Sequence, residues 1–268
     1  KDLTVAALAA GCHVLCEKPM AMSATEGREM LAAAKAADKR LMINFSYRFS
    51  AASRGLKAQV DAGLFGDFYF GRSVWHRRRG MPGFGGWFGN KALAGGGPLI
   101  DLGVHRLDLA LWLMGYPKPT WVLGSSYDAV AREIADKAGK HYDVEDLACG
   151  LIKFDNGATL VLEASWAANI QESELMETRL LGTRAGLLQK NVNEGYTFEA
   201  NVYTEVNGAP VDMHLKAPTA TAKSAMFDYA EAILSGQPHP APGEEGLIVM
   251  EILDAIYASA ASGAPVQL

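Results

Sequence analysis

The first 46 residues alternate between helical segments and short apolar runs. The pattern predicts a helix over residues 3–10 and another over residues 24–37. A capping box that starts at Ser23 precedes the second helix. Two apolar runs, 13–17 and 40–45, have the length and composition of buried strands. Helix, strand, helix and strand joined by short connections are typical of a parallel α/β sheet.

From Asp67 onward, apolar and polar residues alternate, and turn residues separate the runs. The triplet 155–157 (Asp-Asn-Gly) predicts a hairpin, and hairpin-linked strands make an antiparallel sheet. Strands are predicted over residues 68–75, 121–127, 146–154, 158–166, 174–181 and 186–189, with two more on either side of 207–208. Helices are predicted over residues 53–62, 98–114, 223–235 and 243–262. The sequence therefore predicts a piece of parallel α/β structure followed by an α+β domain with a large antiparallel sheet.

The segment 95–115 carries the most informative pattern in the chain. Three glycines at its start allow a loop to approach a ligand closely, and Gly115 suits the end of the helix that follows. That helix is apolar on almost every face except at Asp101, His105 and Asp108, which share one stripe. Because buried charged groups need partners, the stripe faces either a satisfied polar network or a pocket. The glycine loop, together with a second motif nearer the N-terminus, favours the pocket.

This second motif is Glu17-Lys18-Pro19, which follows the first predicted strand. Open α/β sheets place their ligands at the carboxyl ends of the strands, where a lysine presents an ammonium group to the cleft. Taken alone, three residues do not distinguish such a site from an exposed lysine beside a helix start.

Composition and charge narrow the class of protein. The 268 residues are 49% hydrophobic and 21% charged, which is typical of a globular protein with one large domain or two smaller ones. A net charge of −5 and a pI of about 5.7 argue against a nucleic-acid partner. No apolar run approaches the roughly 20 residues that span a bilayer. Cys12, Cys16 and Cys149 complete no metal-binding set, so we expect free thiols in a reducing cytoplasm and no metal site.

Taken together, the motifs resemble those of the glucose–fructose oxidoreductase, inositol dehydrogenase and rhizopine-catabolism (Gfo/Idh/MocA) family. The Glu-Lys-Pro motif, paired with the Gly-Gly-Gly, Asp and His segment, is the specific part of the resemblance. The matching segments cover almost the entire chain in the same order and comprise residues 10–19, 95–108, 144–146, 154–157 and 259–266.

The resemblance implies a two-domain enzyme that uses NAD or NADP and acts on a sugar, an inositol or a related polyol. Residues 1–46 would be the C-terminal remnant of a Rossmann domain. Residues 47–268 would form a substrate and oligomerisation domain with a mostly antiparallel sheet. The open face of this sheet often makes oligomer contacts in the family, so we expect a homo-oligomer, a dimer or a tetramer, in the cytoplasm. Neither nucleic acid nor a membrane is expected as a partner.

The chain departs from the family pattern at its start. The Gly-x-Gly-x-x-Gly turn and the acidic residue that contacts the ribose are expected upstream of Lys1. Because each βαβ unit has about 30 residues, roughly 60–90 residues of the domain are expected to be missing. The glycines of segment 83–86 follow no suitable strand and do not replace the turn. We therefore expect this chain alone to hold NAD poorly.

The resemblance assigns the chemistry to Lys18, Asp101 and His105. Oxidation of a carbinol requires removal of the hydroxyl proton, and histidine titrates close enough to neutrality to be the base. Asp101 would orient His105 or hold substrate hydroxyls, and Lys18 would polarise the reacting oxygen. The expected cofactor contacts are Glu17, Lys18, Pro19 and Arg48.

Three further residues, Trp75, His76 and Trp87, are candidate substrate contacts. Indole rings can stack on a sugar, although packing in the core or in a lid accounts for both tryptophans equally well. His76 adjoins the charge run 77–79, which we expect to face solvent or an interface. Asp108 is expected to anchor the central helix through hydrogen bonds and to take no part in chemistry.

Three functions remain compatible with the sequence. The leading one is an NAD(P)-dependent dehydrogenase or reductase that moves a hydride between nicotinamide and a hydroxyl-bearing carbon. The second is an NAD-dependent glycosidase of the same family, in which the same hydride step activates a glycoside for elimination. The third is a non-catalytic sugar-binding or scaffold protein, against which the joint presence of Lys18, Asp101 and His105 argues.

Overall fold

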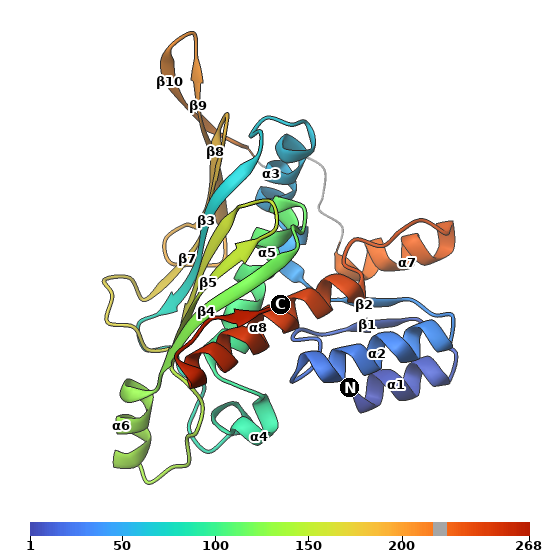
Figure 1. Cartoon of the computed structure of the whole chain (residues 1–268), viewed down its shortest axis with the longest axis vertical. Helices are drawn as coiled ribbons and strands as arrows, with labels where there is room; N and C mark the ends of the chain where they lie inside the picture. Colours follow the sequence, from blue (N-terminus) through green and yellow to red (C-terminus); the bar gives the residue numbers. More distant parts are fainter. Residues whose placement is uncertain (217–223) are drawn as a thin grey trace.

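A two-stranded parallel sheet and a nine-stranded mixed sheet divide the chain into two parts (Figure 1). The structure is a computed structural model that describes residues 1–216 and 224–268. In the first part, helices lie along one side of two short parallel strands. Its elements are α1 (Asp2–Ala9), β1 (Val14–Cys16), α2 (Ala24–Ala36) and β2 (Leu41–Ile43).

The local signals in the first part act as the sequence predicts. The Ser23 side chain accepts a hydrogen bond from the backbone N–H of Glu26 at 3.3 Å, so it caps the start of α2. Gly11 follows α1 with a φ of +84°, a conformation that favours glycine. All three residues of β2 are buried, as expected for a strand covered on both faces.

The nine-stranded sheet confirms the prediction of a large, mostly antiparallel sheet. Its strand order is β10-β9-β8-β7-β3-β6-β5-β4-β11, and among the described residues only β3 and β6 pair in parallel. The strands are β3 (Phe68–Arg77), β4 (Pro119–Tyr127), β5 (Leu147–Phe154), β6 (Thr159–Ser165), β7 (Glu174–Gly182), β8 (Gly186–Asn191), β9 (Phe198–Val206), β10 (Ala209–His214) and β11 (Val266–Gln267).

Helices cover one face of this sheet and leave the other face largely open (Figure 1). Helices α3, α5 and α8 lie on the covered face, and α6 lies at the lower end of the sheet. The helical elements are η1 (Ser46–Phe49), α3 (Ala51–Asp61), η2 (Trp87–Gly89), α4 (Lys91–Ala94), η3 (Leu99–Gly103), α5 (Val104–Met114), α6 (Ala129–Lys137), α7 (Ala225–Ser235) and α8 (Gly243–Ser262). Among the described helices, none has the length and apolar character needed to cross a membrane.

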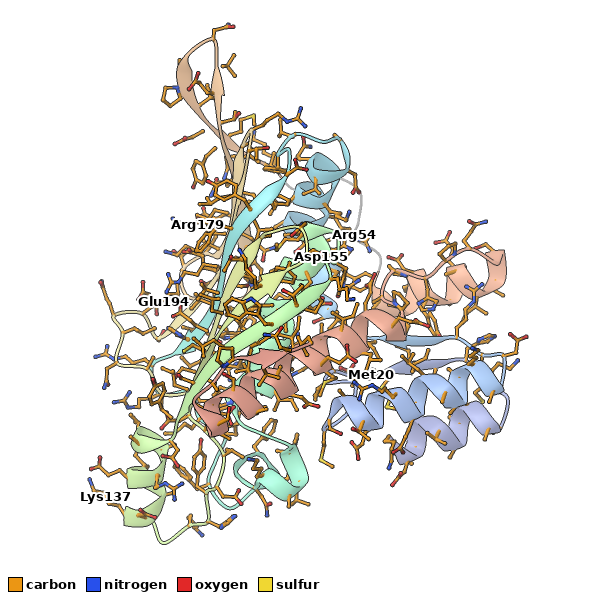
Figure 2. The ribbon with its side chains drawn as sticks, in the orientation of Figure 1. Met20, Arg54, Lys137, Asp155, Arg179 and Glu194 are labelled. Atoms are coloured by element: carbon orange, nitrogen blue, oxygen red, sulfur yellow. The ribbon has the colours of Figure 1, made fainter. Side chains whose placement is uncertain are left out.

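Helix α8 joins the two parts of the molecule. Its residue Asp254 accepts a hydrogen bond from the backbone N–H of Ala24 at 2.8 Å, at the first turn of α2. Met20 packs between α2 and α8, where a side chain in place of Gly27 or Gly246 would press against its sulfur (Figure 2). On its other side, α8 packs on β4 so closely that Gly124 has no room for a Cβ. The small parallel sheet is thereby fixed to the edge of the large one.

Two of the longer elements differ from the sequence prediction. Helix α6 was not predicted, although Ala131 and Ala135, one turn apart, form its buried face. The central helix begins as a π-helical turn over Leu99–Gly103 and continues as the α-helix Val104–Met114. The predicted start of the 223–235 helix lies at a residue outside the described part of the chain.

Candidate active site

The motif Glu17-Lys18-Pro19 follows β1 directly, at the carboxyl end of the parallel strand pair. The Lys18 ammonium donates to the backbone carbonyl of Asp101 and to its carboxylate Oδ1, at 2.9 Å each. The two side chains are 19% and 18% exposed, so both remain in contact with solvent-accessible space. The ion pair brings together two motifs that are 83 residues apart in the sequence.

Asp101 lies within the π-helical turn that opens the central helix. Its second oxygen, Oδ2, accepts a hydrogen bond from the indole N–H of Trp166 at 3.1 Å. Since Lys18 holds the other oxygen, the carboxylate is fixed from two sides. Single π-helical turns inside α-helices occur frequently at functional sites.

Glu145 holds the glycine loop in front of this turn. Its carboxylate accepts hydrogen bonds from the backbone N–H groups of Gly97 at 2.9 Å and Leu99 at 3.0 Å, and from the Tyr257 hydroxyl at 2.9 Å. A Cβ at Gly96 would collide with Tyr257, and one at Gly97 with Glu145. The glycines therefore permit close packing against buried groups of this chain, in addition to any approach to a ligand. Burial raises the pKa of Glu145, and the two backbone hydrogen bonds oppose that rise.

The imidazole of His105 lies one turn after Asp101 and is nearly buried. It packs edge-on against the ring of Tyr47, with 4.9 Å between centroids, and lies 5.6 Å from the ring of Trp75. Its Nδ1 atom is buried and has no hydrogen-bond partner among the described residues. The aromatic contacts fix the ring without satisfying its polar atoms.

The charges around His105 are predominantly positive. Burial lowers the pKa of His105 well below its ordinary value, and the cations of Lys18, Arg106 and Arg77 lower it further. The imidazole is therefore uncharged at neutral pH and able to accept a proton. The same positive surroundings stabilise negative charge that develops on an oxygen atom bound beside the histidine.

Two cavities meet at the ion pair. The first, of about 650 Å³, lies beside α1 and the Glu-Lys-Pro motif. The second, of about 560 Å³, is lined by His105 and the aromatic residues around it. Lys18, Asp101 and Phe88 line both cavities, so the two cavities adjoin at these residues. A ligand in either cavity would therefore contact the same lysine and aspartate.

The structure distributes the remaining predicted site residues over different places. Glu17 and Pro19 line the first cavity, where Glu17 also accepts a hydrogen bond from the Asn44 side chain at 2.6 Å. Trp75 lines the second cavity. Trp87, predicted as a substrate contact, lines the first cavity and not the second, and its ring stacks on that of Phe88.

His76 lies away from both cavities. Strand residues alternate between faces, so His76 points to the open face of the sheet while Trp75 and Arg77 point to the covered face. Its Nε2 is 3.5 Å from the carboxylate of Glu163, a residue of β6 on the same open face. The structure therefore gives His76 no contact with the candidate site.

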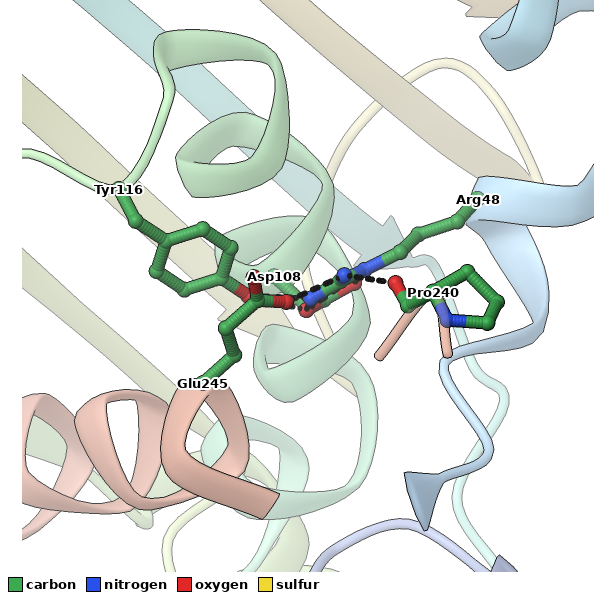
Figure 3. A network of polar contacts seen from close by, with 5 residues as sticks. All are labelled: Arg48, Asp108, Tyr116, Pro240 and Glu245. Atoms are coloured by element: carbon green, nitrogen blue, oxygen red, sulfur yellow. Dashed lines mark hydrogen bonds and ion pairs between the residues drawn. The ribbon is translucent and has the colours of Figure 1, made fainter. Parts of the chain in front are cut away.

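Arg48 is also apart from the cavities, in a buried polar network (Figure 3). Its guanidinium donates to both carboxylate oxygens of Asp108, to the carbonyl of Pro240 at 2.8 Å, to Glu245 at 2.5 Å and to the Tyr116 hydroxyl. Burial acts to lower the pKa of Arg48, but the acidic groups around it raise it overall. The structure thus uses Arg48 to link η1, α5 and α8, whereas the sequence predicted a cofactor contact.

Three residues that line the second cavity were not predicted as site residues: Tyr47, Arg77 and Tyr196. Arg77, expected at a solvent-facing or interface position, donates to Glu174 at 2.8 Å and to the Tyr196 hydroxyl at 2.9 Å. Trp75 donates to the same Glu174 oxygen at 2.6 Å. Residues alternate between the two faces along β3, so Arg77 lies on the same face as Trp75. This alternation could have identified Arg77 as a site residue from the sequence.

Parallel strands with a cavity at their carboxyl ends, joined to a mixed sheet, are an architecture of NAD-binding oxidoreductases. Consistently, residues 1–45 match the family model described as "Oxidoreductase family, NAD-binding Rossmann fold". Residues 53–188 match the model described as "GFO/IDH/MocA C-terminal domain". The chain therefore belongs to the Gfo/Idh/MocA family of oxidoreductases, as its motifs predicted.

Individual relatives agree with this assignment. The chain is 36% identical to D-glucoside 3-dehydrogenase of Escherichia coli, over 99% of this chain and 75% of the relative. It superposes on aldose-aldose oxidoreductase from Caulobacter crescentus with a TM-score of 0.81 and 26% identity, over 100% of this chain and 75% of the other. A levoglucosan dehydrogenase in complex with NADH and levoglucosan has the same fold, with a TM-score of 0.85, 22% identity, and coverage of 99% and 76%.

Proposed function

We propose that this chain transfers a hydride between the nicotinamide of NAD(P) and a hydroxyl-bearing carbon of a sugar or related polyol. The observation that carries the proposal is the Lys18–Asp101 ion pair where two cavities adjoin, with His105 lining one of them. The use of NAD(P) and the presence of three free thiols support a cytoplasmic site of action.

The first cavity fits the coenzyme side of such a site, because it opens at the carboxyl end of β1 and contains Glu17, Lys18 and Pro19. When bound, the nicotinamide supplies the hydride acceptor or donor. Trp87, on the same cavity, would contact the coenzyme rather than the sugar.

In the second cavity, His105 would accept the proton of the substrate hydroxyl as the C–H bond breaks. Lys18 would donate a hydrogen bond to the reacting oxygen and stabilise its developing negative charge. Asp101, held by Lys18 and Trp166, would keep the ammonium in position and accept hydrogen bonds from neighbouring substrate hydroxyls.

For the substrate, we propose a glucoside or a similar pyranose, because the E. coli relative is named for oxidation of D-glucosides at position 3. The test is the formation of NADH or NADPH by the protein with a panel of hexoses, methyl glucosides and inositols. Fluorescence titration with NADH and NADPH identifies the coenzyme independently of turnover. Because this chain alone is expected to hold NAD poorly, both assays are repeated with a version extended upstream of Lys1. Absence of binding and turnover in both proteins would refute the oxidoreductase proposal.

An aryl glucoside separates this function from that of an NAD-dependent glycosidase. A dehydrogenase produces reduced coenzyme in proportion to substrate consumed and retains the aryl group on the product. A glycosidase releases the phenol with catalytic amounts of NAD and accumulates no reduced coenzyme. We expect the first result.

We further propose a homo-oligomer formed through the open face of the large sheet. Leu123, Leu151 and Val161 lie in one row across β4, β5 and β6 on that face. Arg72 and Arg179 continue the row (Figure 2 labels Arg179). Light scattering after size exclusion tests this proposal: the wild type should be dimeric or tetrameric, and Leu151→Arg should give monomers. A monomeric wild type would refute it.

A further inference from the structure

Arg106 follows His105 in α5 and is fully buried. One terminal nitrogen, Nη1, donates to the side-chain oxygen of Gln189 at 3.2 Å. Its Nε and Nη2 atoms have no hydrogen-bond partner among the described residues, and no carboxylate of that part of the chain forms an ion pair with it. A buried guanidinium without an acidic partner is costly, so its presence needs an explanation.

Three aromatic rings enclose this guanidinium. Its carbon Cζ lies 4.5 Å from the ring centroid of Tyr47, 5.1 Å from that of Phe198 and 5.6 Å from that of Trp75. Such contacts stabilise a cation through the negative faces of the rings. Tyr47 and Trp75 are also the rings that contact His105 and line the second cavity, so the cation lies directly behind the wall of the site.

Arg106 remains charged at neutral pH. Burial lowers its pKa to about 10, and Tyr47 opposes that decrease. At pH 7 the side chain therefore carries a full positive charge. Since the neighbouring rings and the amide of Gln189 are neutral, this charge acts on His105 without an opposing carboxylate.

The other cations near the central helix are paired. The titratable and charged groups that surround His105 and Arg106 are Lys18 with Asp101, Arg77 with Glu174, Arg48 with Asp108 and Glu245, and the hydroxyls of Tyr47 and Tyr196. A carboxylate partner reduces the field of a paired cation, although Lys18 still lowers the pKa of His105 more than Arg106 does. Arg106 is thus distinguished from these cations by its lack of an acidic partner in the described chain.

We propose that Arg106 is a positioning residue that acts through His105: its unpaired charge keeps the imidazole neutral, and the rings around it hold the imidazole in place. The histidine is thereby kept available as a proton acceptor at mildly acidic pH, where an ordinary histidine would be protonated. This inference rests on the proposed role of His105 as the base.

The decisive variant is Gln189→Glu, which places a carboxylate opposite Nη1 with almost no change in volume. The guanidinium and its aromatic contacts remain, while a negative charge is added and the hydrogen bond from the Gln189 amide to the Ser53 hydroxyl is lost. Gln189→Met lacks the same bond to Ser53, so a comparison of the two variants isolates the charge. We expect the titration midpoint of the His105 ring, followed by NMR of histidine ring protons and assigned with His105→Gln, to rise by about one pH unit. Gln189→Met, which removes the hydrogen bond without adding charge, should leave the midpoint near that of the wild type.

Two substitutions at Arg106 itself give an independent test. Arg106→Met should raise the midpoint as Gln189→Glu does, whereas Arg106→Lys should keep it low. Thermal melting and amide spectra establish that each variant is folded. If the midpoint of His105 is unchanged in both Gln189→Glu and the folded Arg106→Met, the inference is overturned.

The acidic limb of the pH profile of kcat/KM links the inference to catalysis. In Gln189→Glu this limb should move to higher pH by the same amount as the NMR midpoint. A shift in NMR without turnover on any sugar would leave the role of Arg106 intact and refute the proposed function. Turnover with an unshifted acidic limb and an unshifted NMR midpoint would refute the role of Arg106 and leave the proposed function intact.

Discussion

The central helix carries buried polar groups at two levels along its axis, one around Asp108 and one around His105, and the surroundings of the two levels differ. Around Asp108, the carboxylate is bound by Arg48 and Tyr116, and Arg48 makes further bonds to α8 and the chain before it. Around His105, one imidazole nitrogen lacks a partner, and the adjacent Arg106 has no carboxylate. Burial is similar at both levels, so burial alone does not identify a functional group. Completeness of hydrogen bonding separates the two.

The difference also explains why the two levels tolerate buried charge. At Asp108 the charges neutralise each other and join three elements, so the network stabilises the fold only while all members are present. At the other level, His105 lines a cavity, and its Nδ1 has no hydrogen-bond partner among the described residues. We therefore expect substitutions at the two levels to affect different measurements.

The largest expected effect is on activity, in His105→Ala. Loss of a general base typically reduces rates by about 10²–10⁴-fold, and kcat/KM should fall within this range. The stability of His105→Ala should be similar to or higher than that of the wild type. In the wild type, the imidazole keeps an unsatisfied polar atom, Nδ1, in the folded state, and the substitution removes it. Steady-state kinetics and thermal melting measure both. A folded variant that retains wild-type kcat/KM would remove His105 from the mechanism.

Asp108→Ala should show the opposite combination. Removal of Asp108 leaves Arg48 with Glu245 as its remaining acidic partner. Breaking a buried ion pair typically costs about 3–5 kcal/mol of unfolding free energy. Glu245→Gln is the matched control, because Glu245 is the more exposed partner of the same guanidinium and should cost less. Urea unfolding measures both. If Asp108→Ala were as stable as the wild type, the network would not be the structural link described above.

Much of the fold follows from local signals in the sequence. The 243–262 helix, the Ser23 cap and the Gly115 end of the central helix were predicted at or near the observed residues, because capping chemistry acts over a few residues. The meeting of Lys18 with Asp101 was expected from family motifs and not from local pattern. Contacts across 83 residues depend on how the whole chain packs.

The predictions that failed did so for the same reason, because the contacts of these residues depend on how the whole chain packs. Asp101, His105 and Asp108 share one stripe in the sequence, but the first two line the cavity. Asp108 is bound by Arg48, which confirms its expected role as an anchor of the helix. An arginine after a strand can bind a ligand or an internal carboxylate, and sequence spacing does not distinguish these outcomes. The missed role of Arg106 is similar, since its surroundings come from η1, β3 and β9.

Glu145 bears on both the fold and the candidate site. Glu145→Gln should therefore lower both the stability and kcat/KM moderately. The neutral amide weakens the acceptor for the N–H groups of Gly97 and Leu99, at a cost of about 1–3 kcal/mol. Because this loop leads into the turn that holds Asp101, kcat/KM should also fall several-fold. Glu133→Gln on the exposed surface of α6 is the control and should change neither. A change in stability without a change in kcat/KM would show that the loop does not position Asp101.

The smallest expected effect is a pH dependence of stability. The pKa of His105 in the folded protein is well below 6.5, whereas in the unfolded chain it is near 6.5. Below about pH 6.5 the unfolded state therefore binds a proton that the folded state does not, and stability falls as pH decreases. The contribution is fully present above that pH. A single proton gives a slope of at most about 1.4 kcal/mol per pH unit.

Comparison of the wild type with His105→Gln isolates this contribution. His76 and His239, whose pKa values burial also lowers, act in the same direction in both proteins. Glu145, whose pKa burial raises, acts in the opposite direction in both. Urea unfolding between pH 5 and pH 8, about the range where histidines titrate, should therefore give a shallower acidic slope for His105→Gln. Equal slopes would mean that His105 has the same pKa in the folded and unfolded states, and the lowered pKa would be refuted.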